Sequence, residues 1–274
     1  MDMACVLCGS ADSPTDEDVL PRWLLRTFDV QGPVTVNARQ ESGEPQAIAT
    51  RPNPKIMLRG GLCGKCNNER LSRLENAVKP ILAPMARHTK PTVLDRDSQR
   101  LLAAWAVKTV YLLELAVRQQ YPGTRLVEGY EPSIAEIGWL LDQLERRPAA
   151  QIEPPPRSMV WLARWDCREL SVVNYAPSSA ALPTPNSGEV VGQFTTLALG
   201  FVAFQVFTVD YVAATQHEAV VWNTRPPDSI GPAIPRIWPL LLGAGDVSWP
   251  PAAFPNGDFD RLASWDSVLR RGVA

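Results

Sequence analysis

The sequence predicts an α+β protein of 274 residues with three successive parts. Two Cys-x-x-Cys pairs lie within the first 66 residues, helical periodicity dominates residues 97–144, and runs rich in β-branched and aromatic residues follow from residue 159. We therefore expect a small amino-terminal domain over residues 1–90. A larger domain over residues 91–274 is expected to contain a helical middle and a β-rich, mostly antiparallel carboxy-terminal part.

Four of the five cysteines form two knuckles, Cys5 with Cys8 and Cys63 with Cys66. Thiolates are soft, charged ligands, and a two-residue spacer lets one tight turn present two sulfur atoms to the same ion. The pattern predicts one structural zinc ion with four cysteine ligands; the alternative is unrelated buried thiols or disulfides. Because the amino terminus lacks the features of a secretory signal, we expect a reducing cytoplasm, which favours metal over disulfide.

The amino-terminal region is expected to follow the order knuckle, hairpin, knuckle, helix. Strand-like residues 33–36 and 55–58 flank a polar loop and predict the hairpin. After the second knuckle, Pro80 and Pro84 predict a kink or an end in the helix. Its apolar face is formed by Leu71, Leu74, Val78 and Leu82.

A long helix is predicted next. Asp97 or Ser98 can cap it, and it runs to about Tyr121 with apolar residues nearly all round, as expected at the centre of a core. Its most apolar stretch contains Lys108 and Glu114 and is short for a bilayer span, so we expect no membrane segment.

A further helix and several strands follow. Ser133 and Glu136 form a capping box, and the helix it starts is expected to pack on the preceding one. The Pro- and Trp-rich tail is expected to be irregular. Strands are predicted over residues 159–165, 170–175, 190–196, 201–209 and 219–222.

Charge is distributed unevenly. The formal net charge of −2 argues against a protein that coats nucleic acid over its whole surface. Between residues 51 and 90, however, there are nine basic residues and only two acidic ones. Such an excess suits contact with phosphate groups, although a solvated helix face is the alternative. The candidate nucleic-acid contacts are Arg59, Lys65, Arg70 and Arg73.

The two knuckles, the segment 16–24 between them and the Asn67-Asn68 pair after Cys66 resemble the four-cysteine branch of the HNH endonuclease family. The resemblance covers roughly the first 85 residues. It implies a treble-clef fold of the ββα-metal type, in which a hairpin and a helix hold a catalytic divalent metal and four cysteines hold a separate zinc. The chemistry it implies is metal-assisted hydrolysis of a phosphodiester.

By this resemblance, Glu17 matches the acidic metal ligand and Asn67 the ligand at the helix start, while Asp18 stands where the catalytic histidine belongs. Asn37 or Asn53 would orient the base. An Asp carboxylate, with an unperturbed pKa of about 3.9, is a much weaker base than imidazole, and loss of a general base costs roughly 10²- to 10⁴-fold in rate.

Oxygen ligands suit Mg²⁺ or another divalent ion, so Asp16, Glu17, Asp18 and Asn67 are candidate ligands; the alternative is that the acids are solvated turn residues. We expect Glu17 and Asp18 either to face solvent or to bind such an ion.

Neither His88 nor His217 is expected to replace the missing base, and Trp23 and Cys167 are expected to serve packing. Two functions follow. The first is an HNH-type endonuclease, or a descendant of one, that binds nucleic acid, with DNA as the expected ligand. Its metal-dependent hydrolysis of phosphodiesters is expected to be weak or lost. The second is a non-catalytic zinc-stabilised factor that binds a partner protein or nucleic acid, such as a regulator or a factor in conflict between phage and host.

Overall fold

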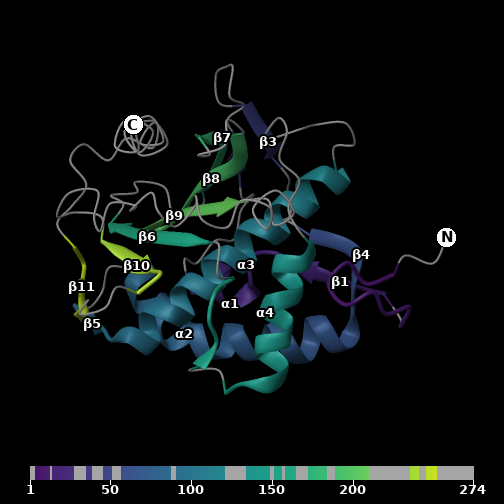
Figure 1. Ribbon diagram of the computed structural model, residues 1–274, viewed down its shortest axis with the longest axis horizontal. Helices are drawn as coiled ribbons and strands as arrows, with labels where there is room; N and C mark the ends of the chain where they lie inside the picture. The colour runs from purple at the N-terminus through teal and green to yellow at the C-terminus, as the bar shows by residue number, and fades with distance from the viewer. Residues whose placement is uncertain are drawn as a thin grey trace.

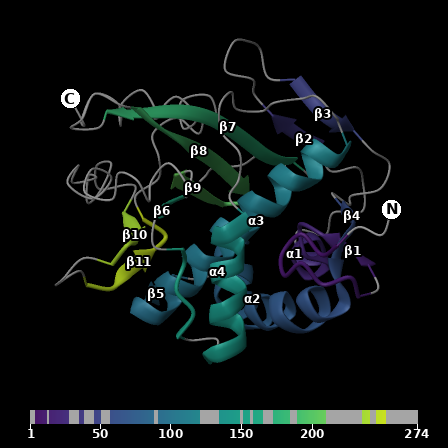
Figure 2. The same cartoon turned by 45° about the vertical axis from the view of Figure 1, so that its right-hand side comes forward.

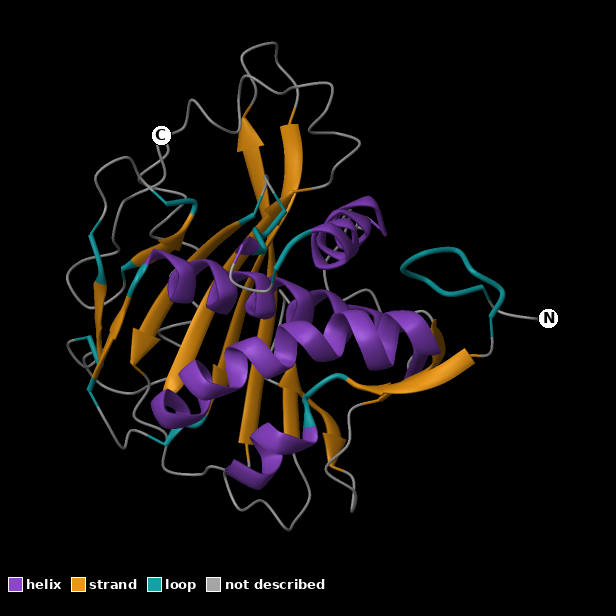
Figure 3. Cartoon of the chain, turned by 90° about the horizontal axis from the view of Figure 1, so that it is seen from below, coloured by secondary structure: helices purple, strands orange, loops and turns teal. Residues whose placement is uncertain are grey.

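The computed structural model describes residues 4–12, 14–27, 35–38, 46–50, 57–87, 91–120, 134–148, 151–155, 158–164, 172–183, 189–209, 235–240 and 245–251. They form a mixed α+β fold built in layers (Figures 1 and 2). Helix α3 (Arg96–Gln120) contacts strands of a seven-stranded sheet on one side and α2 (Ser72–Ala86) on another. Seen from below, the helices cross the strands of this sheet (Figure 3).

A separate hairpin pairs β1 (Pro14–Asp18) with β4 (Met57–Cys63) in antiparallel register. The expected pairing of residues 33–36 with 55–58 is therefore wrong, since Met57 and Leu58 belong to β4 and pair with β1. Leu58 and Leu62 are buried on β4, and the Thr15 hydroxyl donates to the Leu62 carbonyl at 2.9 Å. The short helix α1 (Arg22–Thr27) follows β1 and places Leu24 and Leu25 in the core.

The helix after the second knuckle begins as a π-helical segment, η1 (Lys65–Leu71), and continues as α2. The expected end at the prolines is wrong, because Pro80 and Pro84 both lie inside α2. Pro80 is exposed, as is Asn76 one turn before it, so the carbonyl that loses its partner at the proline can bond water. The predicted apolar face is buried: Leu71, Leu74, Val78 and Leu82.

Helix α3 is the centre of the core, as predicted. Every residue from 101 to 114 is buried. Its cap is Asp95 rather than Asp97 or Ser98: the Ser98 backbone N–H donates to Asp95 Oδ1 at 2.8 Å. Helix α4 (Ile134–Arg146) contacts α3, which confirms the predicted packing of the two helices, whereas Ser133 of the predicted capping box lies outside the described residues. No described helix is sufficiently long and apolar to span a bilayer.

The large sheet joins residues from both halves of the sequence. Strand β2 (Thr35–Ala38) runs parallel to β7 (Val172–Pro183) and pairs with β3 (Gln46–Thr50), so these two early strands belong to the same sheet as the carboxy-terminal strands. The predicted strands between residues 159 and 209 are confirmed, whereas 219–222 lies outside the described residues. The strand order is β10 (Arg236–Trp238), β6 (Met159–Arg164), β9 (Val202–Val209), β8 (Glu189–Leu199), β7 (Val172–Pro183), β2 (Thr35–Ala38) and β3 (Gln46–Thr50).

The tail is less irregular than expected. Strand β10 closes one edge of the large sheet, and β11 (Val247–Trp249) pairs antiparallel with β5 (Thr92–Leu94). Trp249 is buried, and its packing explains why a segment without strand periodicity is ordered. One continuous hydrophobic core includes residues from the cysteine knuckles, α2, α3 and the large sheet.

Candidate metal centre and adjoining pocket

The structure brings the four cysteines of the two knuckles together where β4 ends. All four sulfur atoms lie within 4.8 Å of one another, and the Cys8 and Cys63 sulfurs are 3.7 Å apart. At a Zn–S distance of about 2.3 Å, the sulfurs of a tetrahedral site lie about 3.8 Å apart. The cluster therefore has the dimensions to hold a metal ion such as zinc.

Backbone hydrogen bonds set the positions of these sulfur atoms. The Gly9 N–H donates to the Cys5 carbonyl at 2.8 Å, and Gly9 adopts a φ of 72°, which glycine tolerates without a steric cost. The Val6 N–H donates to the Gly61 carbonyl at 2.9 Å and so joins the first knuckle to β4. Two knuckles that are far apart in sequence are thereby held face to face.

The thiols differ in acidity. Burial acts to raise the pKa of Cys5, but hydrogen bonds from the backbone of Cys63, Cys8 and Leu7 lower it to about 7. Burial, with the neighbouring cysteines, raises the pKa of Cys66. Four thiolates cannot share this space without a compensating cation, so the donor set suits a divalent metal.

A cluster of charged side chains lies beside the sulfur of Cys66. The Arg70 guanidinium donates to Cys66 Sγ at 3.4 Å and also to the Glu145 carboxylate on α4. Lys65 forms an ion pair with the same carboxylate at 3.2 Å. These two cations lower the pKa of Glu145. Arg70 thus links a candidate metal ligand to α4, a contact of the kind that orients ligands from outside the coordination shell.

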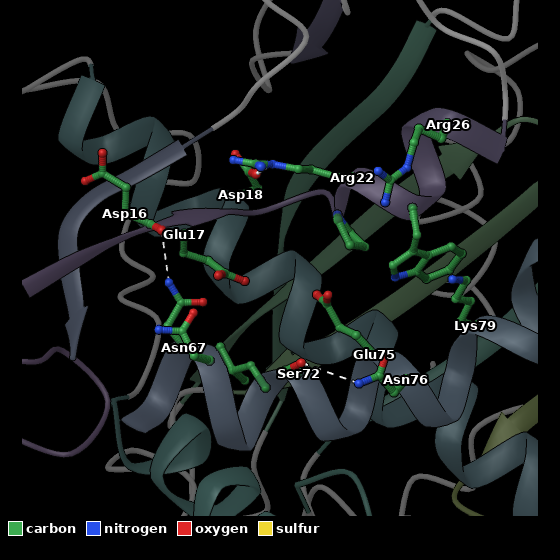
Figure 4. Close-up of a pocket in the computed structure, with 14 residues that line it drawn as sticks. Asp16, Glu17, Asp18, Arg22, Arg26, Asn67, Ser72, Glu75, Asn76 and Lys79 are labelled. Atoms are coloured by element: carbon green, nitrogen blue, oxygen red, sulfur yellow. Dashed lines mark hydrogen bonds and ion pairs between the residues drawn. The ribbon is translucent and has the colours of Figure 1, made fainter. Parts of the chain in front are cut away.

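The helical segment η1, which carries Cys66, also borders a polar pocket of about 480 Å³. The walls of the pocket are β1, α1, η1 and the first half of α2 (Figure 4). Three of the residues expected to carry chemistry, Glu17, Asp18 and Asn67, line this pocket together. The bonding partners of these residues show what each is able to do.

Glu17 does not face solvent, so the first of the two expected alternatives is wrong for this residue. Its side chain is buried, and a carboxylate oxygen lies 3.6 Å from Nζ of Lys108 on α3. The same ammonium lies 2.7 Å from Glu75 on α2. Figure 4 shows the Glu17 and Glu75 carboxylates directed toward one another. The cation that balances the buried Glu17 in this structure is therefore an ammonium.

The pKa values of the cluster reflect its burial. Burial, supplemented by the charges of Glu75 and Asp18, raises the pKa of Glu17 to about 7, although Lys108 opposes the shift. Burial acts to lower the pKa of Lys108, but the two carboxylates outweigh it and raise that pKa. Lys108 therefore stays protonated at any pH at which the protein is expected to work.

Asp18 and Asn67 are also engaged. Arg22 Nε lies 2.7 Å from Asp18 Oδ2, while Asp18 Oδ1 is buried without a partner among the described residues. The Asn67 amide nitrogen donates to the Thr15 hydroxyl at 3.0 Å and to the Asp16 carbonyl at 2.9 Å. These bonds fasten the helix start to β1 and leave the amide oxygen of Asn67 as the atom with which it could bind a metal ion.

The predicted nucleic-acid residues lie in different environments. Arg70 is buried and occupied by Cys66 and Glu145, and Lys65 is exposed but paired. Arg59 and Arg73 are exposed; the backbone N–H and carbonyl of Arg59 bond the Gln119 side chain at 2.8 and 2.6 Å. Only part of this basic set is therefore presented to solvent.

Several candidates cannot be placed in the site. Asn37 lies on β2, in the large sheet rather than in the β1–β4 hairpin. Asn53, His88, Cys167 and His217 lie outside the described residues. The residue that sequence reasoning missed is Lys108, and its signal was present: a lysine in an otherwise apolar helix face must find an anionic partner once buried.

No known protein family matches this chain, and no curated protein or solved structure matches it significantly. The likeness to the HNH family consequently rests on the residues described above.

Proposed function

We propose that this chain is an HNH-like zinc protein that binds nucleic acid and in which metal-dependent phosphodiester hydrolysis is weak or lost. The observation that carries the proposal is the position of Lys108, whose ammonium contacts Glu17 at 3.6 Å and Glu75 at 2.7 Å. It supplies positive charge at the acidic residue that the resemblance assigns to a catalytic metal.

The order of elements supports the HNH-like assignment. Strand β1 carries Glu17 and Asp18, β4 runs antiparallel to it and ends at Cys63, and the helix that follows carries Cys66 and Asn67. This is the strand, strand, helix order of the ββα-metal type, with residues 28–56 inserted between the two strands. The side chain of Asn67 reaches back to β1, as a ligand at the helix start must.

Two features argue against efficient hydrolysis. A divalent ion at Glu17 would have to displace a buried ammonium or lie beside it, and like charges repel strongly in such an environment. Asp18, in the position of the general base, is ion-paired to Arg22, and a carboxylate is a weaker base than an imidazole.

Zinc is the metal that the cysteine cluster suits best. Four thiolate ligands in tetrahedral arrangement close the coordination shell, and closed sites of this kind are structural. Bound zinc would supply cross-linking of the two knuckles. The chain's own contribution is the backbone that positions the sulfurs and the Arg70 guanidinium beside Cys66.

The test combines a binding and a cleavage assay on the full chain. We expect retardation of duplex DNA that weakens steeply between low and physiological salt. We expect no nicking of plasmid DNA by the natural chain with Mg²⁺, Mn²⁺ or Ni²⁺, and nicking by an Asp18→His/Lys108→Met double variant. Asp142→Asn, an exposed change on α4, serves as the control.

Robust cleavage by the natural chain that Glu17→Ala or Asn67→Ala abolishes would overturn the loss of hydrolysis. Absence of binding to any nucleic acid at low salt would overturn the binding role and favour the partner-protein alternative.

A further inference from the structure

We infer that the α1–α2 side of the pocket is a phosphate-binding subsite, formed by Arg26 and Lys79 and bordered by the indole of Trp23. The inference rests on the proposed function, because it names the place where a phosphate group of the bound nucleic acid lies. These residues differ from the basic set predicted from the sequence.

The charges of the pocket separate into paired and unpaired groups. Glu17 and Glu75 share Lys108, and Asp18 pairs with Arg22. Arg26 and Lys79 are exposed and form no ion pair with a described residue. Figure 4 shows both on one side of the pocket, opposite Asp16 and Asn67. The α1–α2 side of the pocket therefore carries two cations without an ion-pair partner among the described residues, and an anion is the ligand that they attract.

The indole N–H that borders these two cations also lacks an acceptor among the described residues. Trp23 lines the pocket, and its Nε1 atom is buried without a hydrogen-bond acceptor in the described part of the chain. An indole nitrogen can only donate, so the group that satisfies it must accept. A phosphate group offers several acceptor oxygens together with the charge that Arg26 and Lys79 would neutralise.

The size of the pocket also fits. At about 480 Å³ it is larger than a phosphate group and leaves room for the attached sugar and base. Phosphate of a nucleic-acid strand and free phosphate share this chemistry, and the experiment distinguishes them.

The experiment titrates the full chain with inorganic phosphate, a mononucleotide and a short DNA duplex. Binding is followed by the NMR resonance of the Trp23 indole N–H, assigned with Trp23→Phe, and by fluorescence anisotropy of labelled duplex. We expect all three ligands to shift that resonance. The Arg26→Ala/Lys79→Ala double variant should weaken duplex binding at least tenfold and reduce the slope of log K against log salt by about 2.

The matched control is Arg146→Ala, since Arg146 is exposed on α4 and pairs with Asp142; its affinity and slope should equal those of the natural chain. Thermal melts of both variants verify folding. Duplex binding that is unchanged in the double variant overturns the subsite while the nucleic-acid role stands. A third outcome is that phosphate shifts the resonance, the double variant abolishes this shift, and the protein binds no DNA or RNA. That outcome supports the subsite and overturns the nucleic-acid role. No shift with any ligand overturns the inference.

Discussion

Nζ of Lys108 lies 3.6 Å from a carboxylate oxygen of Glu17, and the lysine side chain is almost completely buried. The contact joins the central helix α3 to the strand that carries the candidate catalytic acids. The sequence suggested a boundary between two domains at residues 90 and 91, and this contact joins residues from both sides of it. The pairing of β2 with β7 does the same. The site and the core therefore depend on one another.

Replacement of Lys108 by methionine should destabilise the protein by about 3–5 kcal/mol, because the buried Glu17 and the half-buried Glu75 lose their cation. Chemical denaturation at pH 8 measures the change. Arg146→Met, which disrupts only an exposed pair on α4, should cost less than about 0.5 kcal/mol. An unchanged unfolding midpoint for Lys108→Met would contradict the buried cluster.

The pKa of Glu17, raised from 4.5 to about 7 in the folded state, predicts a pH dependence of stability. Between these values the native state holds a proton that the unfolded state has released, so stability falls as pH rises. Its contribution is complete below pH 4.5 and is lost as pH passes about 7. Glu17→Gln should remove this slope, as measured by denaturation at several pH values with zinc in excess. Equal slopes for the natural chain and the variant would disprove the assignment.

We expect one equivalent of zinc per chain in protein purified without chelator, and loss of folded structure in the amino-terminal region when it is removed. Elemental analysis and circular dichroism are the measurements. Cys63→Ser should lower the metal content, because Cys63 is buried inside the cluster. Less than half an equivalent in the natural chain would remove the basis for a structural zinc site.

Arg70→Ala should weaken metal retention by roughly 10- to 100-fold, since a donor to a ligand sulfur is lost. Competition with a chromogenic chelator measures the affinity. Arg73 lies one turn further along the helix at an exposed position, so Arg73→Ala should leave the affinity for the metal unchanged. Similar retention in both variants would show that the Arg70 contact is incidental to the metal.

Features set by short sequence spacing could be predicted. The cysteine cluster follows from two local turns, and the burial of α3 follows from apolar residues around its whole circumference. Glu17, Asp18 and Asn67 were expected together and do line one pocket.

Features that depend on long-range contacts could not be predicted from the sequence. Nothing local shows that the segment containing Met57 would pair with β1, because the insertion of residues 28–56 separates the strands. Pro80 falls on the exposed face of α2, a fact that only the packing of the helix decides. Lys108 has two acidic partners, Glu17 and Glu75, that are distant from it in sequence, so its role depends on the tertiary structure.

The topology of β2 has a consequence for synthesis on the ribosome. Both knuckles are complete once residue 66 has emerged, so the cysteine centre can close early. Strand β2 emerges at the same stage, yet its parallel neighbour β7 (Val172–Pro183) is made more than a hundred residues later. Until then one edge of the β2–β3 pair lacks this partner, and exposed strand edges invite intermolecular pairing. Nascent chains halted before residue 172 should therefore aggregate more readily than the finished protein.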